Sequence, residues 1–225
     1  MGYLGSKAAS GTYQTVIAQM PAHDTYIETH LGSGAVLRAK PPSPRNIGIE
    51  IDRKVLEAFV APYFGVELHC MDAVKFLKSF HFARAGRVLI YADPPYLHET
   101  RTSTKRYRHE YSAQDHRRLL ATLRTVPALV LISGYPSKLY DALLADWRSI
   151  EFPSMTRGGV RTEKLWMNFK SSPAHWAAFA GVDRTDRQRI KRKAARWAKN
   201  YQALAPAERT AVLAALLETH KGELA

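Results

Sequence analysis

The run Asp93-Pro94-Pro95-Tyr96 brings together groups that could activate an amine, namely a carboxylate, two fixed carbonyls and an aromatic ring. It follows the apolar residues 88–92, which predict a strand buried on both faces of a parallel sheet. Because two successive prolines cannot donate to a sheet ladder, the strand must end at this run. In open α/β sheets, that carboxyl edge is where ligands bind.

The exocyclic amine of a nucleic-acid base suits such a site, because its lone pair is delocalised into the ring and needs activation. The Asp93 carboxylate and the Pro94 carbonyl would each accept a hydrogen bond from the amine, and Tyr96 would stack on the base. Pro95 would stiffen the turn, so that these groups are placed in advance. The alternative interpretation is a turn that ends a strand and carries an exposed aspartate.

Acidic residues and glycines follow the earlier predicted strands. The strand at 26–28 ends in Glu28 and leads to Gly32 and Gly34, where the absence of side chains lets a ligand approach the backbone. This is not the full dinucleotide fingerprint, and it suits a nucleoside better than a pyrophosphate. The strand at 46–52 ends in Glu50 and Asp52. An acid at this place commonly binds ribose hydroxyls; Glu50 is the first candidate and Asp52 the second.

Two of these acids have a structural alternative. Asp52 is equally suited to cap the helix that begins at Arg53. Asp72, which follows the predicted strand 66–70, would either cap the next helix or bind the amine of a cofactor adenine. The N-terminal segment adds Tyr3 and Lys7, an aromatic ring and a cation in a small-residue loop that could face the same ligand.

Basic residues gather in two segments beside the expected site. Residues 98–111 interleave cations with aromatic rings, and in a chain of net charge +13 a nucleic-acid loop is favoured over a merely solvated one. A second basic tip, at 157–162, lies between expected hairpin strands at 147–152 and 164–169. The residues expected to contact nucleic acid are Arg101, Lys105, Arg106, Tyr107, Arg108, Arg157 and Arg161.

Composition limits the class of protein. A chain of 225 residues is long enough for one α/β domain and an appendage, and its pI of about 9.9 indicates a polyanionic partner. The lone Cys70 excludes internal disulfides and fits a reducing cytosol, so we expect a cytoplasmic protein. We expect no membrane segment, no signal peptide and, from the scattered histidines, no metal.

With these motifs in place, the chain resembles the Dam-like N6-adenine DNA methyltransferases, especially the short phage and prophage types. The resemblance covers roughly residues 1–170 and rests on motifs in the family's order. These are residues 3–7 as the cofactor loop, 28–34 as the glycine motif, 49–50 as the acidic strand end, 71–73 as the adenine contact and 93–96 as the catalytic motif.

Two departures from the family pattern concern the two ligands. Glu28-Thr29-His30 stands where the family usually has Glu-Pro-Phe, which is expected to loosen the cofactor pocket. Residues 77–87 are too few for the target-recognition insert that Dam-like enzymes carry between their third and fourth motifs. The target sequence of the family therefore does not transfer to this chain.

The resemblance implies an α/β, Rossmann-like fold of S-adenosylmethionine-dependent methyltransferases, with a terminal antiparallel hairpin. It implies a methyltransferase domain at 1–170. Separately, the shift to basic composition from Ser171 predicts a helical extension at 171–225, in which residues 183–201 and a segment from Pro206 are helical. Catalysis would fall to residues 93–96. S-adenosylmethionine would be held by Tyr3, Lys7, Glu28, Gly32, Gly34, Glu50, Asp52, Asp72 and Asp93.

The implied reaction is methylation of N6 of a flipped adenine in double-stranded DNA. Two alternatives stay open: methylation of another exocyclic amine (guanine N2 in RNA or cytosine N4 in DNA), and a DNA-binding regulator that has lost catalysis. Because the chain lacks a recognition insert, we also expect a homodimer on a near-palindromic site, joined through an apolar stripe in the extension.

Overall fold

The computed structural model describes residues 11–100, 108–156, 159–171 and 174–223. The chain divides into two compact units, residues 1–179 and 180–225. The first unit continues nine residues beyond position 170, where the sequence suggested a boundary, and Trp176 and Phe179 pack against its core.

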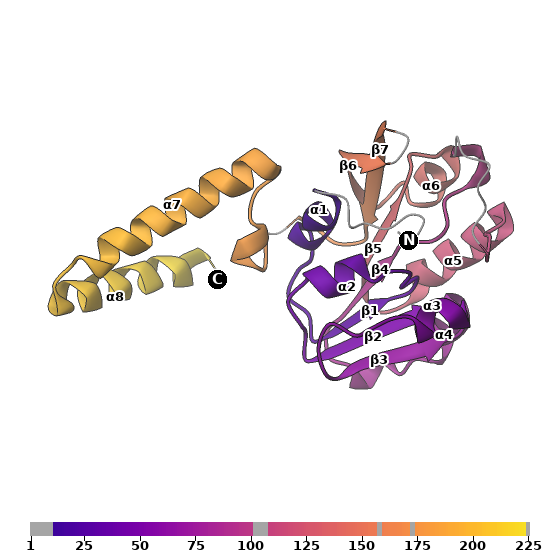
Figure 1. Cartoon of the computed structure of the whole chain (residues 1–225), viewed down its shortest axis with the longest axis horizontal. Helices are drawn as coiled ribbons and strands as arrows, with labels where there is room; N and C mark the ends of the chain where they lie inside the picture. Colours follow the sequence, from indigo (N-terminus) through magenta and orange to yellow (C-terminus); the bar gives the residue numbers. More distant parts are fainter. Residues whose placement is uncertain (1–10, 101–107, 157–158, 172–173, 224–225) are drawn as a thin grey trace. The chain divides into compact units, whose positions relative to one another are not determined.

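The first unit is built on a seven-stranded sheet in the order β3-β2-β1-β4-β5-β7-β6 (Figure 1). The first five strands in this order run parallel, and β7 runs antiparallel to both β5 and β6. This confirms the expected Rossmann-like methyltransferase fold with a terminal antiparallel hairpin. The strands are β1 (Thr25–Glu28), β2 (Arg45–Glu50), β3 (Val66–Cys70), β4 (Val88–Ala92), β5 (Leu129–Gly134), β6 (Arg148–Thr156) and β7 (Gly159–Met167).

Helices cover both faces of this sheet, as the alternation of helices and strands along the chain requires. One face carries α4, α5 and α6 over side chains such as Ile27, Ile90 and Ile132. The other carries α1, α2 and α3 over Tyr26, Leu89 and Leu131. The helices are α1 (Thr12–Ala18), α2 (Ala35–Ala39), α3 (Arg53–Glu57), α4 (Ala73–Ser79), α5 (Ala113–Thr125) and α6 (Lys138–Leu143), with short 3₁₀ turns at Phe82–Arg84, His98–Thr100 and Ala177–Phe179.

The central strand β4 is buried over its whole length, which is why its sequence is apolar without alternation. Its register aligns Ile90 with Ile27 of β1 and with Val130 of β5. Because β1 and β4 are neighbours whose connections lead to opposite sides of the sheet, their carboxyl ends form the switch point at which open α/β sheets bind ligands in a crevice. The Asp-Pro-Pro-Tyr run lies at that crevice.

The hairpin is longer than the sequence suggested, and its tip correspondingly shorter. Strand β6 continues to Thr156 and β7 begins at Gly159, so Val160 and Arg161 are paired with Met155 and Ser154 rather than looped out. The prediction of a loop at 157–162 was therefore wrong in extent. Paired strands hold Arg161 in a defined place, which an open loop would not do.

The second unit contains α7 (Arg184–Gln202) and α8 (Pro206–Glu223), as the sequence predicted. Asp183 caps α7 by accepting a hydrogen bond from the Asp186 N–H at 2.8 Å. No residue of α7 is buried. Over the whole part of the chain that the structure describes, no helix combines the length and apolarity needed to cross a bilayer.

Candidate active site

Asp93 stands at the end of β4 and is held by the neighbouring strand. Its Oδ1 accepts a hydrogen bond of 2.7 Å from the hydroxyl of Ser133 in β5, and that hydroxyl lies 2.9 Å from the Tyr91 hydroxyl. Ser133 and Tyr91 are buried, while Asp93 is half-buried. The Ser133 hydroxyl therefore fixes the direction of the carboxylate.

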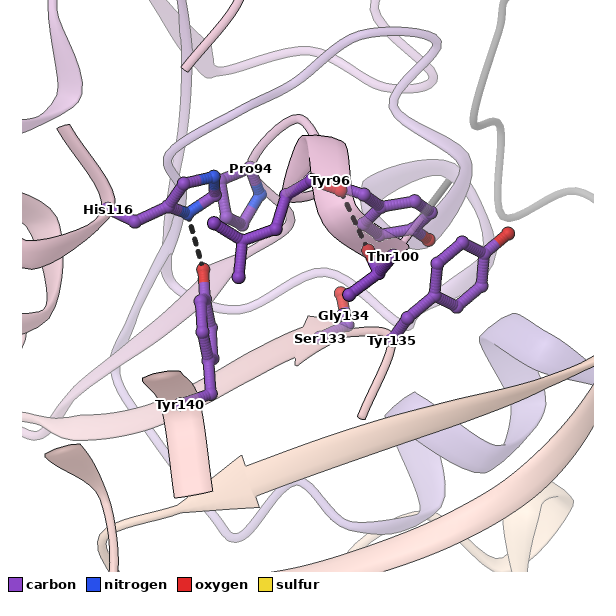
Figure 2. Close-up of a pocket in the computed structure, with 9 residues that line it drawn as sticks. Pro94, Tyr96, Thr100, His116, Ser133, Gly134, Tyr135 and Tyr140 are labelled. Carbon is purple, nitrogen blue, oxygen red and sulfur yellow. Dashed lines mark hydrogen bonds between the residues drawn. The ribbon is translucent and has the colours of Figure 1, made fainter. Parts of the chain in front are cut away.

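A small pocket opens beside this motif (Figure 2). Its enclosed volume is about 10 Å³, close to the space of one water molecule, and it reaches about 200 Å³ only when the open mouth is included. Four of its nine lining residues carry aromatic rings, and Thr100 and Ser133 add aliphatic hydroxyls, so flat and polar surfaces meet in its walls. The lining residues are Pro94, Tyr96, Leu97, Thr100, His116, Ser133, Gly134, Tyr135 and Tyr140.

Tyr96 is positioned by one residue of β7 and by one residue that follows β5. Its hydroxyl donates to Oε1 of the buried Glu163 in β7 at 2.9 Å, and its ring lies 4.3 Å from that of Tyr135, centroid to centroid. The guanidinium of Arg161 lies 5.8 Å from the Tyr135 ring. The expected aromatic partner of a base is thus preset in orientation, and Arg161 is brought beside it.

Glu28, at the end of β1, is buried below the glycine turn. Its Oε2 accepts hydrogen bonds from the Tyr26 hydroxyl at 2.8 Å and from the Leu37 N–H at 2.9 Å. The second bond ties the first turn of α2 to the strand. Burial raises the pKa of Glu28 to about 8, so a cation placed beside it would favour its ionised form.

Glu50, at the end of β2, holds the glycine turn from the other side. Its Oε2 accepts from the Gly32 N–H at 2.9 Å, and its Oε1 accepts from the Asp52 N–H at 3.0 Å. Gly34 has a φ of +62°, and a Cβ there would overlap the ring of Phe59. Each oxygen of Glu50 has capacity for one more hydrogen bond, as binding a diol requires.

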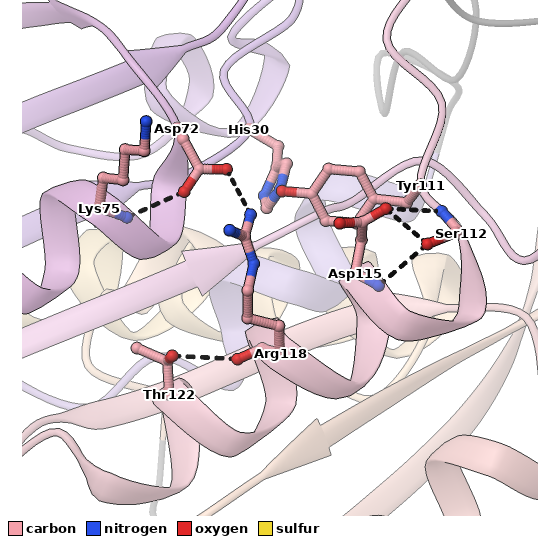
Figure 3. Close-up of polar contacts among 8 residues, drawn as sticks. All are labelled: His30, Asp72, Lys75, Tyr111, Ser112, Asp115, Arg118 and Thr122. Carbon is pink, nitrogen blue, oxygen red and sulfur yellow. Dashed lines mark hydrogen bonds and ion pairs between the residues drawn. The ribbon is translucent and has the colours of Figure 1, made fainter.

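Asp52 and Asp72 both cap helices, the structural alternative for each. Asp52 Oδ1 accepts from the Lys54 N–H at the start of α3, and Asp72 Oδ1 accepts from the Lys75 N–H at the start of α4. Each also carries an arginine: Arg108 at 3.0 Å on Asp52, and Arg118 at 2.9 Å on Asp72 (Figure 3). Arg108, expected on nucleic acid, thus has a carboxylate partner within the chain.

His30 stands where the Dam-like family usually has phenylalanine, and two hydroxyls hold its ring in place. Its Nδ1 lies 2.9 Å from Oγ1 of Thr29, and its Nε2 lies 3.0 Å from the Tyr111 hydroxyl (Figure 3). Burial, and to a lesser degree His116, lowers the pKa of His30 to about 3, so the ring is neutral near pH 7.

Residues 108–118 therefore reach the carboxyl ends of three strands. Tyr111 contacts His30, two residues after Glu28 of β1, Arg108 contacts Asp52 after β2, and Arg118 contacts Asp72 after β3. The same segment leads into α5, whose His116 lines the pocket beside Pro94. One stretch of chain thus borders both the carboxyl ends of these strands and the pocket beside Pro94.

Comparison with solved structures finds methyltransferases that are similar to this chain in fold. No protein-family model matches the chain, and no protein of curated function matches it in sequence. An O-methyltransferase from Streptomyces achromogenes, solved with S-adenosylmethionine, is 15% identical with a TM-score of 0.47, and the match covers 68% of this chain and 77% of that one. The N-methyltransferase NodS from Bradyrhizobium japonicum is 9% identical with a TM-score of 0.47, over 71% and 94% of the two chains. Identities this low leave the assignment of function to the residues of the site.

The site contains residues that motif reading did not single out. Ser133 and Tyr135 could have been found from their place after β5, because the carboxyl ends of parallel strands meet at one edge. Glu163 and Tyr111 gave no local signal. Seven expected contacts cannot be placed because they lie outside the described residues: Tyr3, Lys7, Arg101, Lys105, Arg106, Tyr107 and Arg157.

Proposed function

We propose that this chain is an S-adenosylmethionine-dependent methyltransferase that modifies N6 of an adenine flipped out of double-stranded DNA. The observation that carries the proposal is the Asp-Pro-Pro-Tyr run at the end of β4, beside a small open pocket whose lining includes three tyrosines and a histidine. A stacked base is not accessible to such a site, so the target nucleotide must rotate out of the duplex.

The residues around the pocket suit an amine that needs activation. Asp93, directed by Ser133, and the Pro94 carbonyl would each accept a hydrogen bond from one N6–H group and favour the tetrahedral nitrogen that attacks the methyl group. Tyr96, preset by Glu163, would hold the base by stacking. Because the amine becomes acidic only as it attacks, this arrangement works without a strong general base.

The residues of the crevice fit the cofactor. Glu50 offers two fixed acceptors for a ribose diol, and it holds the glycine turn at Gly32 directly beside them. Glu28 is a buried carboxyl that a cation would stabilise as the anion. When bound there, S-adenosylmethionine would supply the electrophilic methyl group.

The substrate is tested by identifying the modified base. Full-length protein is incubated with isotope-labelled S-adenosylmethionine and either duplex DNA or structured RNA, and the digested nucleosides are separated by mass spectrometry. We expect N6-methyladenine from the duplex. N2-methylguanine from RNA or N4-methylcytosine would reassign the substrate, and cofactor binding without any turnover would indicate a regulator.

Arg161 is expected to read bases near the target. It is placed by the hairpin next to Tyr135, and arginine pairs well with guanine in the major groove. Arg161→Ala should relax sequence preference at one position, with a discrimination loss on the order of 1–3 kcal/mol. Methylation mapped over a randomised duplex library measures it, with Arg161→Lys as the control that keeps the charge. Uniformly weaker methylation with unchanged preference would mark Arg161 as a phosphate contact instead.

We further propose that the enzyme acts as a homodimer on a near-palindromic site. Large apolar side chains of the second unit are exposed, with Trp197 at 58%, Leu213 at 48% and Leu216 at 53%. Pairing two copies through them would bury this surface and double the base contacts. Light scattering of the full chain, free and with DNA, should give twice the monomer mass in at least one sample. A monomer in both would contradict the proposal.

A further inference from the structure

Helix α7 concentrates positive charge in the second unit. Its nineteen residues include eight arginines or lysines and a single acid, Asp186. That acid is already engaged, because it pairs with Arg189 at 2.7 Å. Within the described part of the chain, no carboxylate forms an ion pair with Arg192, Arg196 or Lys199.

The spacing places these cations on one side of the helix. Arg192, Arg196 and Lys199 recur at intervals of four and three residues, so they follow one another along a single face. Ile190, Trp197 and Tyr201 recur on the opposite side. All residues from 191 to 200 are exposed, so the cationic side chains are accessible to a partner.

This arrangement is unfavourable for folding by itself. Like charges three and four residues apart repel one another and destabilise an isolated helix. No cation of this face gains an acid partner that would offset the repulsion within the described residues. A polyanion aligned with the helix would remove it, because each cation would then face a negative group.

We infer that the face formed by Arg192, Arg196 and Lys199, with Lys193 at its border, binds the phosphate backbone of duplex DNA outside the active site. The choice of DNA rests on the proposed function. The face spans about 10–11 Å along the helix axis at 1.5 Å per residue, and duplex DNA offers one phosphate charge per about 1.7 Å. Flexible cations of this kind position a protein without reading sequence.

This surface gives the second unit a role separate from base recognition. It would supply salt-dependent affinity for any duplex, while the pocket and Arg161 select the target. It also leaves the apolar side of α7 available for a second copy, since the two faces lie on opposite sides of the helix.

The test neutralises the face in the full chain with Arg192→Gln, Arg196→Gln and Lys199→Gln together, which preserves helix propensity. The matched control is Lys78→Gln, Arg84→Gln and Arg87→Gln, three exposed cations of the first unit that leave the α7 face intact. Fluorescence anisotropy then measures binding to a labelled duplex of two to three turns, lacking adenine methylation, over a range of salt concentrations. Circular dichroism verifies that both variants keep their helices.

We expect the slope of log affinity against log salt to become shallower by roughly 2–3 for the α7 variant, at about 0.9 per lost phosphate contact. In the control variant, this salt slope should change by less than half as much. In turnover assays, the α7 variant should need more DNA to saturate but reach the same kcat. An unchanged slope in the folded α7 variant would overturn the inference, as would equal losses in both variants. The inference would also be overturned if the α7 variant lost binding to anionic vesicles but still bound DNA as the wild type does.

The binding assay needs no methyl transfer, so the two proposals can fail separately. A chain that methylates no DNA but loses salt-dependent DNA binding in the α7 variant keeps this surface and loses the proposed function. If the chain methylates adenine while its α7 variant binds DNA normally, the proposed function stands and the DNA-binding role of the α7 face is rejected.

Discussion

Asp93→Ala should lower the rate of methyl transfer by about a hundredfold or more and leave the fold intact. Asp93 is the only carboxylate of the Asp-Pro-Pro-Tyr run, and its orientation is set by the Ser133 hydroxyl at 2.7 Å. Removing a preorganised group that stabilises the transition state costs on the order of 10²–10³ in rate. The fold should survive because Asp93 is half-buried and β4 is held mainly by apolar packing.

Single-turnover methylation of a duplex measures this effect, with thermal unfolding and cofactor binding measured on the same samples. Asp93→Asn tests the charge, because it keeps the size of the side chain and one acceptor. Its loss of methyl-transfer rate should be nearly as large as that of Asp93→Ala. Ser133→Ala is the graded control: it removes only the group that directs Asp93 and should cost less than Asp93→Ala. Near-normal turnover by folded Asp93→Ala protein would refute the catalytic assignment.

Glu50→Ala should weaken S-adenosylmethionine binding by about tenfold or more. The side chain is buried at 7% exposure and accepts the N–H groups of Gly32 and Asp52. Its loss would remove the acceptors expected for the ribose diol and leave two backbone donors without their partner. A hydrogen bond to a charged group contributes roughly 1.5–3 kcal/mol, which corresponds to the expected loss in affinity.

Calorimetry with the full-length protein measures the affinity, and thermal unfolding separates a weakened site from an unfolded one. Glu57→Ala is the matched control, because Glu57 is an exposed glutamate at the end of the nearby α3. Glu50→Gln keeps one acceptor oxygen, so its affinity for S-adenosylmethionine should lie between those of the wild type and Glu50→Ala. Lys7→Ala, in the N-terminal segment, is expected to weaken binding as well. Unchanged affinity in both Glu50→Ala and Lys7→Ala would refute the cofactor pocket as described.

The segment 108–118 explains how a chain without a recognition insert could couple its two ligands. Arg118 occupies Oδ2 of Asp72, the side chain that the family resemblance assigns to the cofactor adenine. The same helix brings His116 to the base pocket, where its Nδ1 lies 2.8 Å from the Tyr140 hydroxyl. A ligand that displaces Arg118 in the crevice would thus act on an element that also lines the pocket.

Local patterns in the sequence were sufficient for the framework of this protein. The apolar run of β4 predicted a fully buried central strand, and the acids after β2 and β3 were predicted either to cap helices or to bind a ligand. The structure shows that Asp52 and Asp72 cap α3 and α4. These features were predictable because burial, strand endings and helix capping depend on residues within a few positions of one another.

The contacts that give the site its geometry were decided only by the tertiary structure. Tyr96 and Glu163 are 67 residues apart, His30 and Tyr111 are 81 apart, and Asp93 and Ser133 are 40 apart. Asp93 meets Ser133 and Tyr96 meets Glu163 because the strand order puts β5 directly beside β4 and β7 next to β5. His30 meets Tyr111 because β1 lies on the other side of β4. No local pattern encodes this arrangement. Side-chain contacts across neighbouring strands depend on register and order, so the sequence could name the acids and the aromatic ring but not the partners that orient them.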